Sequence, residues 1–350
     1  DTQLTNLQIA SGYTAEKTKT LLKSYSQLAQ ELGGTTTEVS SAADSWLRQG
    51  YSIQETNDLI KNSMILSKVG QLDSAEATQY LTSAMKGYNI EASNSLSIVD
   101  KLSAVDMEAA VSAGGLAEAM SRTASGAQLA GIEMDKLIGY ATVIGETTQK
   151  SMDTVGESLK SIFARMGQIK AGRLEDPETG EDLSNVETSL GNAGIDLRES
   201  NNEFRNFGEV LDEIGGKWDT YNSVQQRAIA NSIAGIHQYE NFVVLMENYG
   251  KALEYATISA ESNGTATQKF SIYQESAAAK INKTKAAYED LSYTIVNTDA
   301  IKNFFDTLTS VLNVSKNIVD TLGLIPVIMA GIGTYASISG KNAGKLSMPS

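Results

Sequence analysis

The sequence contains no cysteine, only three prolines and a single histidine in 350 residues. Without cysteine the chain can form no disulfide, no thiolate metal site and no cysteine nucleophile, and the redox compartment is left open. Because proline is the residue that most strongly breaks a helix, its scarcity allows many long helices. The histidine, His237, has only Glu240 beside it at a spacing of three, which is no metal motif. We therefore predict an ordinary residue near a helix start.

Positive charge is also scarce, since 28 lysines and arginines stand against 42 aspartates and glutamates, a net charge of −14. A chain of this sign repels nucleic-acid phosphates, so no specific nucleic-acid binding is expected. Acidity is a common route to solubility, and it also suits a protein that shares a narrow conduit with DNA without gripping it. The length allows two or three domains. Because the chain opens on Asp1 and not on methionine, we expect a piece of a longer polypeptide.

Apolar residues recur at three- and four-residue steps through most of the chain, which predicts a mainly α fold of stacked helical hairpins. Helix ends are marked: Gly33 and Gly34 close one helix, residues 35–37 cap the next, and Asp73 with Glu76 makes a capping box. A glycine followed by two apolar residues with one polar residue between them recurs four times. In the first two copies we expect the glycine to be left-handed and Ser52 or Asn89 to cap the next helix. The four copies begin at Gly50, Gly87, Gly131 and Gly194. Their unequal separations exclude a strict repeat.

Residues 180–250 hold the one break in this helical pattern and most of the large aromatics. Ile195 and Leu197 alternate with polar neighbours, residues 200–202 supply turn chemistry, and residues 204–207 can run back, so we predict one short β-hairpin. Helices follow, with Trp218 near a bend or an end because two glycines precede it. The next helix is predicted to open on a capping box of Ser223 and Gln226 and to close at Gly235.

The order of these pieces carries a resemblance. In chain order, the segments that carry it are TEVSSAADSWLRQGYS, LDSAEATQYLTSAMKGYN, GIEMDKLIGYATVIGETT, SLKSIFARMGQIKAG, the hairpin, VLDEIGGKWD and QQRAIANSIAGIHQYENFVVLMENY. Together they resemble the core region of tail tape measure proteins of long-tailed bacteriophages and prophages, over roughly residues 20–255. Where that family leads us to expect an arginine after the AG turn, this chain has Ile236 and His237, so no role for a cation is carried over to them.

An acidic loop separates the helical N-terminal part from this region. Residues 172–182 contain a proline, two glycines and five carboxylates, which predicts an exposed, solvated loop. A calcium loop is the alternative, because five oxygen-bearing residues fall at EF-hand offsets 1, 3, 7, 9 and 12. Offset 6 is Glu181, where the motif needs glycine, which favours the solvated loop. The five are Asp176, Glu178, Asp182, Ser184 and Glu187.

Beyond residue 263 the helical spacing of apolar residues continues over longer stretches. Three- and four-residue steps continue from Phe270 to Ile295 without glycine or proline, and an a/d heptad pattern follows. The heptad stripe is widened to a third position, which favours a helical bundle or an oligomer over a two-stranded zipper. We predict an oligomerisation stripe of Ile301, Phe304, Leu308, Val311, Leu312, Ile318, Val319 and Leu322.

The segment 321–340 carries no charge and is long enough to span a bilayer, although Pro326, glycines and hydroxyls make it a poor membrane helix. A buried helical hairpin and membrane insertion both remain open. The membrane candidates are Leu324, Ile325, Val327, Ile328, Met329 and Ile332. The expected regions are helical hairpins in 1–171, the acidic loop in 172–187, hairpin and helical core in 188–262, long oligomerising helices in 263–322, and an apolar, glycine-rich tail in 323–350.

The resemblance implies a structural tail protein that sets tail length during assembly and is ejected ahead of the DNA. It implies residence in the tail tube lumen, passage to the host envelope at infection, and partners in further copies of the chain as a trimer or hexamer, tail tube subunits and distal tail or baseplate proteins. No catalytic, cofactor or metal residue is predicted, because no carboxylate pair or phosphate loop has the required spacing. A membrane-active translocation or pore-forming protein is the main alternative, and a wall-degrading hydrolase is a weaker one.

Overall fold

The computed structural model of the chain describes residues 2–176, 180–200 and 203–294. They form helices joined by short turns, with one small antiparallel sheet, as the sequence predicts. The helices are α1 Thr2–Ser11, α2 Ala15–Leu32, α3 Thr36–Arg48, α4 Ile53–Val69, α5 Ser74–Gly87, α6 Ser95–Glu108, α7 Ala113–Leu129, α8 Met134–Thr148, α9 Met152–Lys170, α10 Val186–Asn192, α11 Phe207–Lys217, α12 Ser223–Glu247, α13 Tyr249–Ala260, α14 Thr265–Glu275 and α15 Ala277–Thr294. Short 3₁₀ helices span Ala92–Asn94 and Trp218–Thr220, and the strands are β1 Arg198–Ser200 and β2 Glu203–Phe204.

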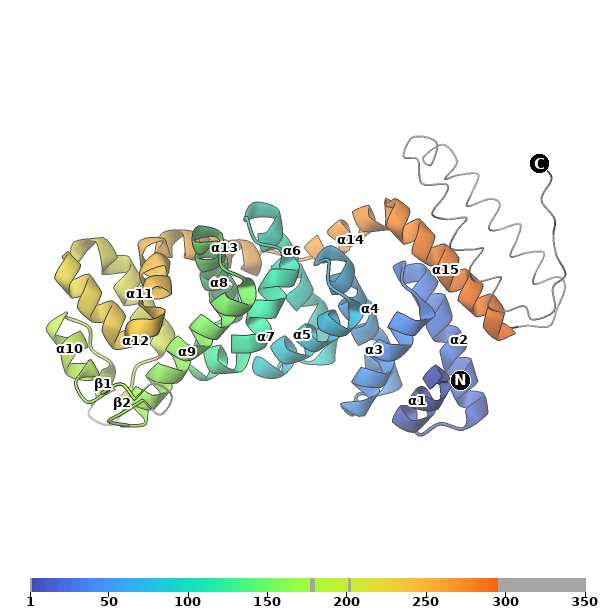
Figure 1. Ribbon diagram of the computed structural model, residues 1–350, viewed down its shortest axis with the longest axis horizontal. Helices are drawn as coiled ribbons and strands as arrows, with labels where there is room; N and C mark the ends of the chain where they lie inside the picture. The colour runs from blue at the N-terminus through green and yellow to red at the C-terminus, as the bar shows by residue number, and fades with distance from the viewer. Residues whose placement is uncertain (1, 177–179, 201–202, 295–350) are drawn as a thin grey trace, which may run out of the picture.

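The first nine helices stack into an elongated, two-row array (Figure 1). Helices α3, α5, α7 and α9 contact one another in sequence along one row, and α4, α6 and α8 do so along the other. Antiparallel neighbours such as α4 with α5 and α6 with α7 join the rows. We call these rows the ladder. They confirm the prediction of stacked helical hairpins, and α10 to α12 lie at the far end of the array (Figure 1).

The last three helices run back along the ladder. Helix α13 packs on α8 and α6, α14 on α6 and α4, and α15 on α2, so the chain returns to the end at which it began (Figure 1). Segments more than 200 residues apart therefore lie in contact: the Tyr273 hydroxyl donates to the Gly33 carbonyl at 3.2 Å, and the Gln274 amide donates to the Glu31 carbonyl at 2.8 Å. These three helices are called the return helices below.

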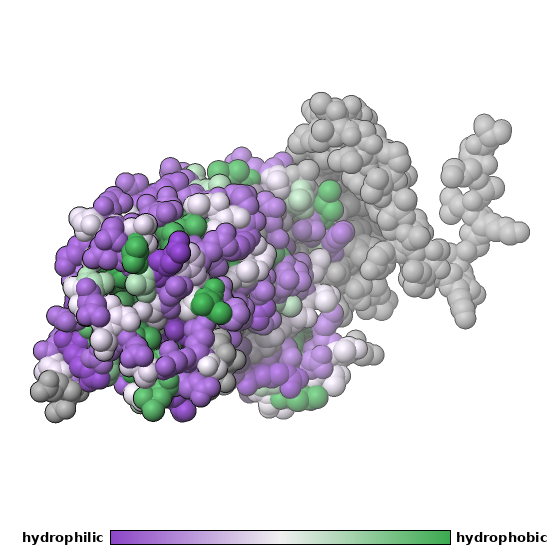
Figure 2. Space-filling model, turned by 60° about the vertical axis from the view of Figure 1, so that its left-hand side comes forward, coloured by the Kyte–Doolittle hydropathy of each residue, from purple (hydrophilic) through white to green (hydrophobic). Residues whose placement is uncertain are grey.

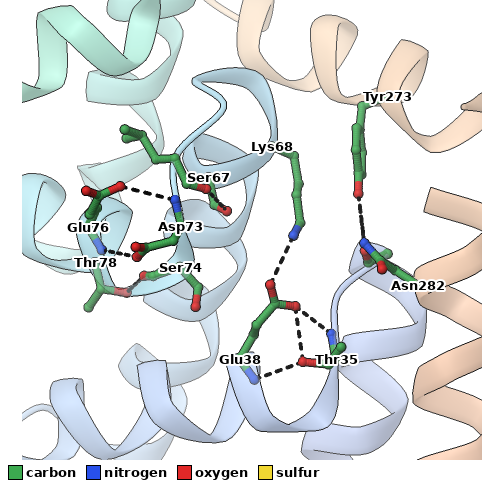
Figure 3. A network of polar contacts seen from close by, with 12 residues as sticks. Thr35, Glu38, Ser67, Lys68, Asp73, Ser74, Glu76, Thr78, Tyr273 and Asn282 are labelled. Carbon is green, nitrogen blue, oxygen red and sulfur yellow. Dashed lines mark hydrogen bonds and ion pairs between the residues drawn. The ribbon is translucent and has the colours of Figure 1, made fainter. Parts of the chain in front are cut away.

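Helix starts follow the predicted capping rules. Thr35 opens α3 and Asp73 opens α5, each in a full capping box, and Ser52 opens α4 in a third. Figure 3 shows how the Glu38 carboxylate serves two purposes, because one oxygen accepts from the Thr35 backbone at 2.7 Å while the other lies 3.5 Å from the Lys68 ammonium on α4. The cap that starts α3 thus also ties α3 to α4.

Small residues let the ladder helices approach closely, and residues 112–131 are rich in glycine and alanine. A Cβ added to Gly114 on α7 would lie 2.2 Å from the Gly70 carbonyl oxygen at the end of α4. A Cβ on Gly139 of α8 would lie 2.1 Å from the Ala252 carbonyl oxygen of α13. Contacts this short exclude any side chain, so the spacing of these helices is set by backbone against backbone.

Two predicted caps are wrong in register. The box that opens α12 is Asn222 with Gln225, one residue before the predicted Ser223 and Gln226, because the longer asparagine side chain reaches two backbone N–H groups. Gly87 stays within α5, and Asn89 takes the left-handed conformation at φ 54° in its place, so Asn89 does not cap the next helix. Asparagine tolerates this region because its side chain is short and polar.

The hairpin and the position of Trp218 match the prediction, whereas the long helix predicted from Phe270 does not. The hairpin pairs β1 with β2, and Ile195 and Leu197 are buried just before it. Trp218 follows the end of α11 and packs edge-on against Phe242, 6.3 Å between ring centroids. The predicted uninterrupted helix from Phe270 is wrong, because it breaks at Ser276, which is extended at φ −67° and ψ 157°. Docking of α14 on α4 and of α15 on α2 imposes this break.

Candidate functional site

His237 lies on α12 just beyond Gly235, and it is exposed. It borders a cavity of about 70 Å³, which has room for a few waters. Two carboxylates, Asp176 and Glu181, also line this cavity, but they face the guanidinium of Arg165, which lies between the acidic loop and α12. The feature that organises this cavity is therefore the arginine, and the predicted ordinary role of His237 stays a prediction.

Arg165 belongs to the buried face of α9 and is only 6% exposed. Its Nη1 donates to Glu181 Oε2 at 2.5 Å and lies 3.6 Å from Asp176 Oδ2, while its Nε donates to the Ser232 carbonyl at 3.2 Å. One cation thus holds two acidic residues of the loop and the backbone of α12. A buried guanidinium needs such partners, because an unpaired charge in this position is strongly destabilising.

The backbone of α12 is shaped to accept this cluster. At Gly235 it turns sharply, with φ 65° and ψ 178°, and the helix resumes beyond the kink. The Ile236 N–H, freed by the kink, donates to Glu181 Oε1 at 3.2 Å. A Cβ at Gly235 would lie 2.7 Å from Glu181 Oε2, so only glycine allows both the conformation and the contact. The predicted closing glycine is therefore a kink inside α12.

These contacts correct the prediction of a fully solvated loop. Asp176 is 7% exposed, Leu183 is 4% exposed, and the Asp176 N–H donates to the Glu181 carbonyl at 2.8 Å. The loop is pinned because its acids have a buried cation to face. We name Arg165, Asp176, Glu181, Gly235 and Ile236 the Arg165 cluster.

Sequence reasoning missed Arg165. Its spacing carried the signal, since Arg165 stands three residues after Ile162 and four before Ile169, both buried on the same face of α9. An arginine on a buried stripe beside a loop of five carboxylates predicts an internal ion pair. In this chain the guanidinium of Arg165 on α9 lies beside the turn at Gly235.

The EF-hand offsets do not assemble a cage in the part of the loop that the structure describes. Asp182 Oδ1 accepts from both the N–H and the hydroxyl of Ser184, and Glu187 pairs with Arg198 at 2.6 Å. Hydrogen bonding to Ser184 lowers the pKa of Asp182. Glu178 lies outside the described residues. Within those residues, no group of three or more histidine, aspartate or glutamate side chains could hold a metal ion.

A second set of polar contacts joins the return helices to the ladder. The buried carboxylate of Asp100 on α6 accepts from the backbone N–H of Ala266 at 2.8 Å and of Gly264 at 3.1 Å, at the start of α14. Asp135 on α8 accepts from the Ser259 hydroxyl at 2.5 Å and pairs with Lys101 at 2.6 Å. A negative charge at a helix start also meets the positive end of the helix dipole.

Tyrosines complete these ties. The hydroxyls of Tyr140 on α8 and Tyr249 on α13 lie 2.8 Å apart, and Tyr249 also donates to Asp212 Oδ1 at 2.7 Å. Asp212 pairs in turn with Lys136 at 2.6 Å. Burial raises the pKa of both tyrosines, so their hydroxyls remain protonated donors. This network fixes α8, α11 and α13 to one another.

Most exposed large apolar side chains are scattered singly. At the end formed by α10 to α12, Figure 2 shows a largely hydrophilic surface with isolated hydrophobic spots. Leu174, Val224 and Ile236 are each more than two thirds exposed. The predicted oligomerisation stripe, Ile301 to Leu322, and the predicted membrane segment, Leu324 to Ile332, lie outside the described residues. None of the helices in the described part is both long and apolar enough to cross a membrane.

The polar contacts described above therefore serve attachment, because buried ion pairs and helix caps hold the loop and the return helices against the ladder. Comparison with known protein families matches residues 26–235, more than half of the chain, to the family described as phage-related minor tail protein. The match runs from the middle of α2 to the kink at Gly235, and so takes in α3 to α9 of the ladder and every member of the Arg165 cluster except Ile236. No solved structure matches the chain.

Proposed function

The chain belongs to the phage-related minor tail protein family, and from that premise we propose that it is a tape measure protein, which occupies the tail tube and sets its length during assembly. Family membership itself gives a structural role in the virion tail. What supports the finer role is the helical construction of the chain, since an extended helix advances 1.5 Å per residue and so converts residue count into length.

The ladder suits the anchor of such a protein better than its ruler. The chain runs out along the ladder and back through the return helices, so adding residues to this part would not add length in proportion. We assign the ruler to extended helix, of which the heptad-patterned residues 301–322 are the candidate in this chain. The ladder, held together by the Arg165 cluster and the polar ties to the return helices, would be the folded module that packs against other tail components.

The partners proposed are further copies of this chain, tail tube subunits, and distal tail or baseplate proteins. The proposed path is the lumen of the tail before infection and the host envelope during it, with the protein leaving ahead of the genome. The net charge of −14 fits this path, because an acidic protein does not bind the phosphates of the DNA that follows it through the tube.

An in-frame deletion in the phage genome tests the length function. Removing residues 301–314, two whole heptads, preserves the a/d register and should shorten the tail by about 21 Å, because fourteen residues at 1.5 Å each are lost. Duplicating the same fourteen residues should lengthen the tail by the same amount. Tail length is measured by electron microscopy of purified particles.

The matched control replaces residues 301–314 by a different helix-forming sequence of equal length. It should leave tail length unchanged, since residue count and not residue identity sets the length. Tails of normal length after both deletion and duplication would refute the length function.

A lytic band from this chain in a zymogram of bacterial cell walls would refute the absence of enzymatic activity.

A further inference from the structure

The junction between α14 and α15 is a point where local sequence and tertiary structure disagree. Residues 265–294 contain no glycine or proline, and the three residues after the break, residues 277–279, are alanines, the best helix formers. The chain nevertheless leaves the helix at Ser276 and re-enters it one residue later. Local preference favours one continuous helix, and only packing on the ladder bends it.

The bend is held by few contacts. The Ser276 hydroxyl accepts from the Ala279 N–H at 3.2 Å as a cap for α15. Across the junction the Asn282 amide reaches the Tyr273 hydroxyl at 3.4 Å, as Figure 3 shows. In a straight helix these two residues would be about 13 Å apart along the axis, since nine residues separate them. The contact between Tyr273 and Asn282 therefore exists only in the bent form.

The described side chains of α15 meet α2 through small residues. The described side chains that α15 buries fully are Ala279 and Ala286, whereas α13 buries two tyrosines together with smaller residues. A Cβ on Gly33 at the end of α2 would lie 3.3 Å from the Ala279 Cβ, so the attachment is close but small. Each of these two alanines buries little apolar surface of its own.

We propose that α15 is an exchange arm: when residues 265–294 straighten across Ser276, α15 leaves its own α2 and docks on α2 of a second copy of this chain. The second copy is the occupant because it alone offers the same surface, on which the contacts of α15 with α2 are remade. Such an exchange is a low-barrier route to a symmetric dimer, since only the hinge differs between the two forms.

Two exposed apolar side chains support this partner. Ile272 is 68% exposed just before the hinge and Ile281 is 38% exposed just after it, and a second copy lying along the straight helix would cover them. The inference rests on the helix junction and not on the tape measure role. A failed tail-length experiment would leave it standing, and its own failure would leave the proposed function standing.

A pair of substitutions at Ser276 tests the hinge in the full chain. Ser276→Ala and Ser276→Gly both remove the capping hydroxyl, but alanine favours the straight helix and glycine opposes it. At equal concentration the dimer constant of S276A should exceed that of S276G by about 25-fold, because two hinges straighten in each dimer and each contributes the roughly fivefold ratio that corresponds to the helix propensity difference of alanine and glycine. Light scattering after size-exclusion chromatography measures the dimer fraction over a concentration series.

A disulfide identifies the exchanged contact, because the natural chain has no cysteine to interfere. A G33C copy and an A279C copy, carrying different tags, are mixed at high concentration and oxidised; exchange predicts a disulfide between the two copies. The G33C/A279C double variant in one dilute chain is the control and should close within the chain, since the two Cβ positions are near the usual disulfide separation. Gly33 has φ 65°, so circular dichroism must show that G33C keeps its helix content.

The distance across the hinge provides a readout that leaves Gly33 intact. In a Q268C/K285C variant, whose two positions are exposed, spin labels should lie about 25 Å apart along the axis in the exchanged dimer and closer in the monomer. Two results would overturn the proposal: S276A and S276G both remaining monomeric at every concentration, or a dimer in which no disulfide forms between copies and the label distance is that of the monomer.

Discussion

The ladder and the far end of the molecule are held together by different physical means. In the ladder, helices meet backbone to backbone through small residues, as at Gly114 against Gly70. At the far end, residues 172–216 carry twelve acidic and three basic side chains, and arginines hold the loop, hairpin and α11 in place. The pairs are Arg165 with Glu181, Arg198 with Glu187, and Arg205 with Glu213.

The two regions differ because close packing suffices for regular helices, whereas a loop and a hairpin need ion pairs. Regular helices bury long apolar stripes, so they can be assembled by close packing alone. A loop and a two-stranded hairpin have few apolar residues to bury and many backbone groups to satisfy, so charge-assisted hydrogen bonds fix them instead. We expect packing defects to dominate the ladder and loss of a buried charge to dominate the far end.

The largest effect is expected at Arg165. Arg165→Met removes the cation and leaves two carboxylates facing each other in a mostly buried site, so the free energy of unfolding should fall by about 3 kcal/mol. Urea denaturation followed by circular dichroism measures it. The control is Arg122→Met, which breaks an exposed pair with Asp153 at 2.6 Å and should lower it by less than about 1 kcal/mol. Equal losses in the two variants would show that burial of Arg165 does not matter.

Next comes the contact of ladder helix α8 with return helix α13. Gly139→Ala places a methyl group 2.1 Å from the Ala252 carbonyl oxygen, which forces the helices apart and should lower the free energy of unfolding by about 2 kcal/mol. The same substitution at Gly167, a helical glycine with no atom near its Cβ position, should raise it by about 0.5 to 1 kcal/mol. If both variants are stabilised in a thermal melt, close approach does not set this spacing.

Asp100 is a point where a buried charge ties a ladder helix to a return helix. Asp100→Asn turns an amide NH₂ toward one of two backbone N–H groups of α14 and should lower the free energy of unfolding by about 1.5 kcal/mol. Hydrogen exchange should become faster in α14 and α15 and stay unchanged in α7 and α9. Asp44→Asn, which breaks an i, i+4 pair with Arg48, should have an effect of about 0.5 kcal/mol or less. Uniform loss of protection throughout the chain would contradict a local tie.

The smallest effect is a pH dependence at the far end. Hydrogen bonds from Lys217 and Arg205 lower the pKa of Glu213, so this carboxylate stabilises the fold above the ordinary glutamate pKa of about 4.3. That contribution is lost as pH falls through the lowered pKa. Glu213→Gln should therefore be less stable than the natural chain at pH 7, by less than about 1 kcal/mol, with the gap closing in acid. A gap that is constant from pH 7 to pH 3 would show that the ion pairs contribute nothing.

Helix caps were predictable because they depend on residues three apart in sequence. Thr35, Ser52 and Asp73 each open a helix as their local sequence requires. That Asn89 and not Gly87 takes the left-handed conformation was not predictable from the sequence. Both residues tolerate that conformation, and the packing of Gly87 on Ala124 decides between them. The Arg165 cluster escaped notice for a similar reason: its members lie on α9, the loop and α12, and only the fold brings them together.

By itself the sequence determined the helical class, most helix starts and ends, the hairpin and the family to which the chain belongs, because each depends on short-range periodicity, capping chemistry or ordered motifs. Only the tertiary structure decided that the chain turns back along its own ladder, that a buried arginine pins the acidic loop, and that a continuous helical pattern breaks at Ser276. Those outcomes depend on contacts between residues far apart in the chain, and such contacts leave no periodic trace in a single sequence.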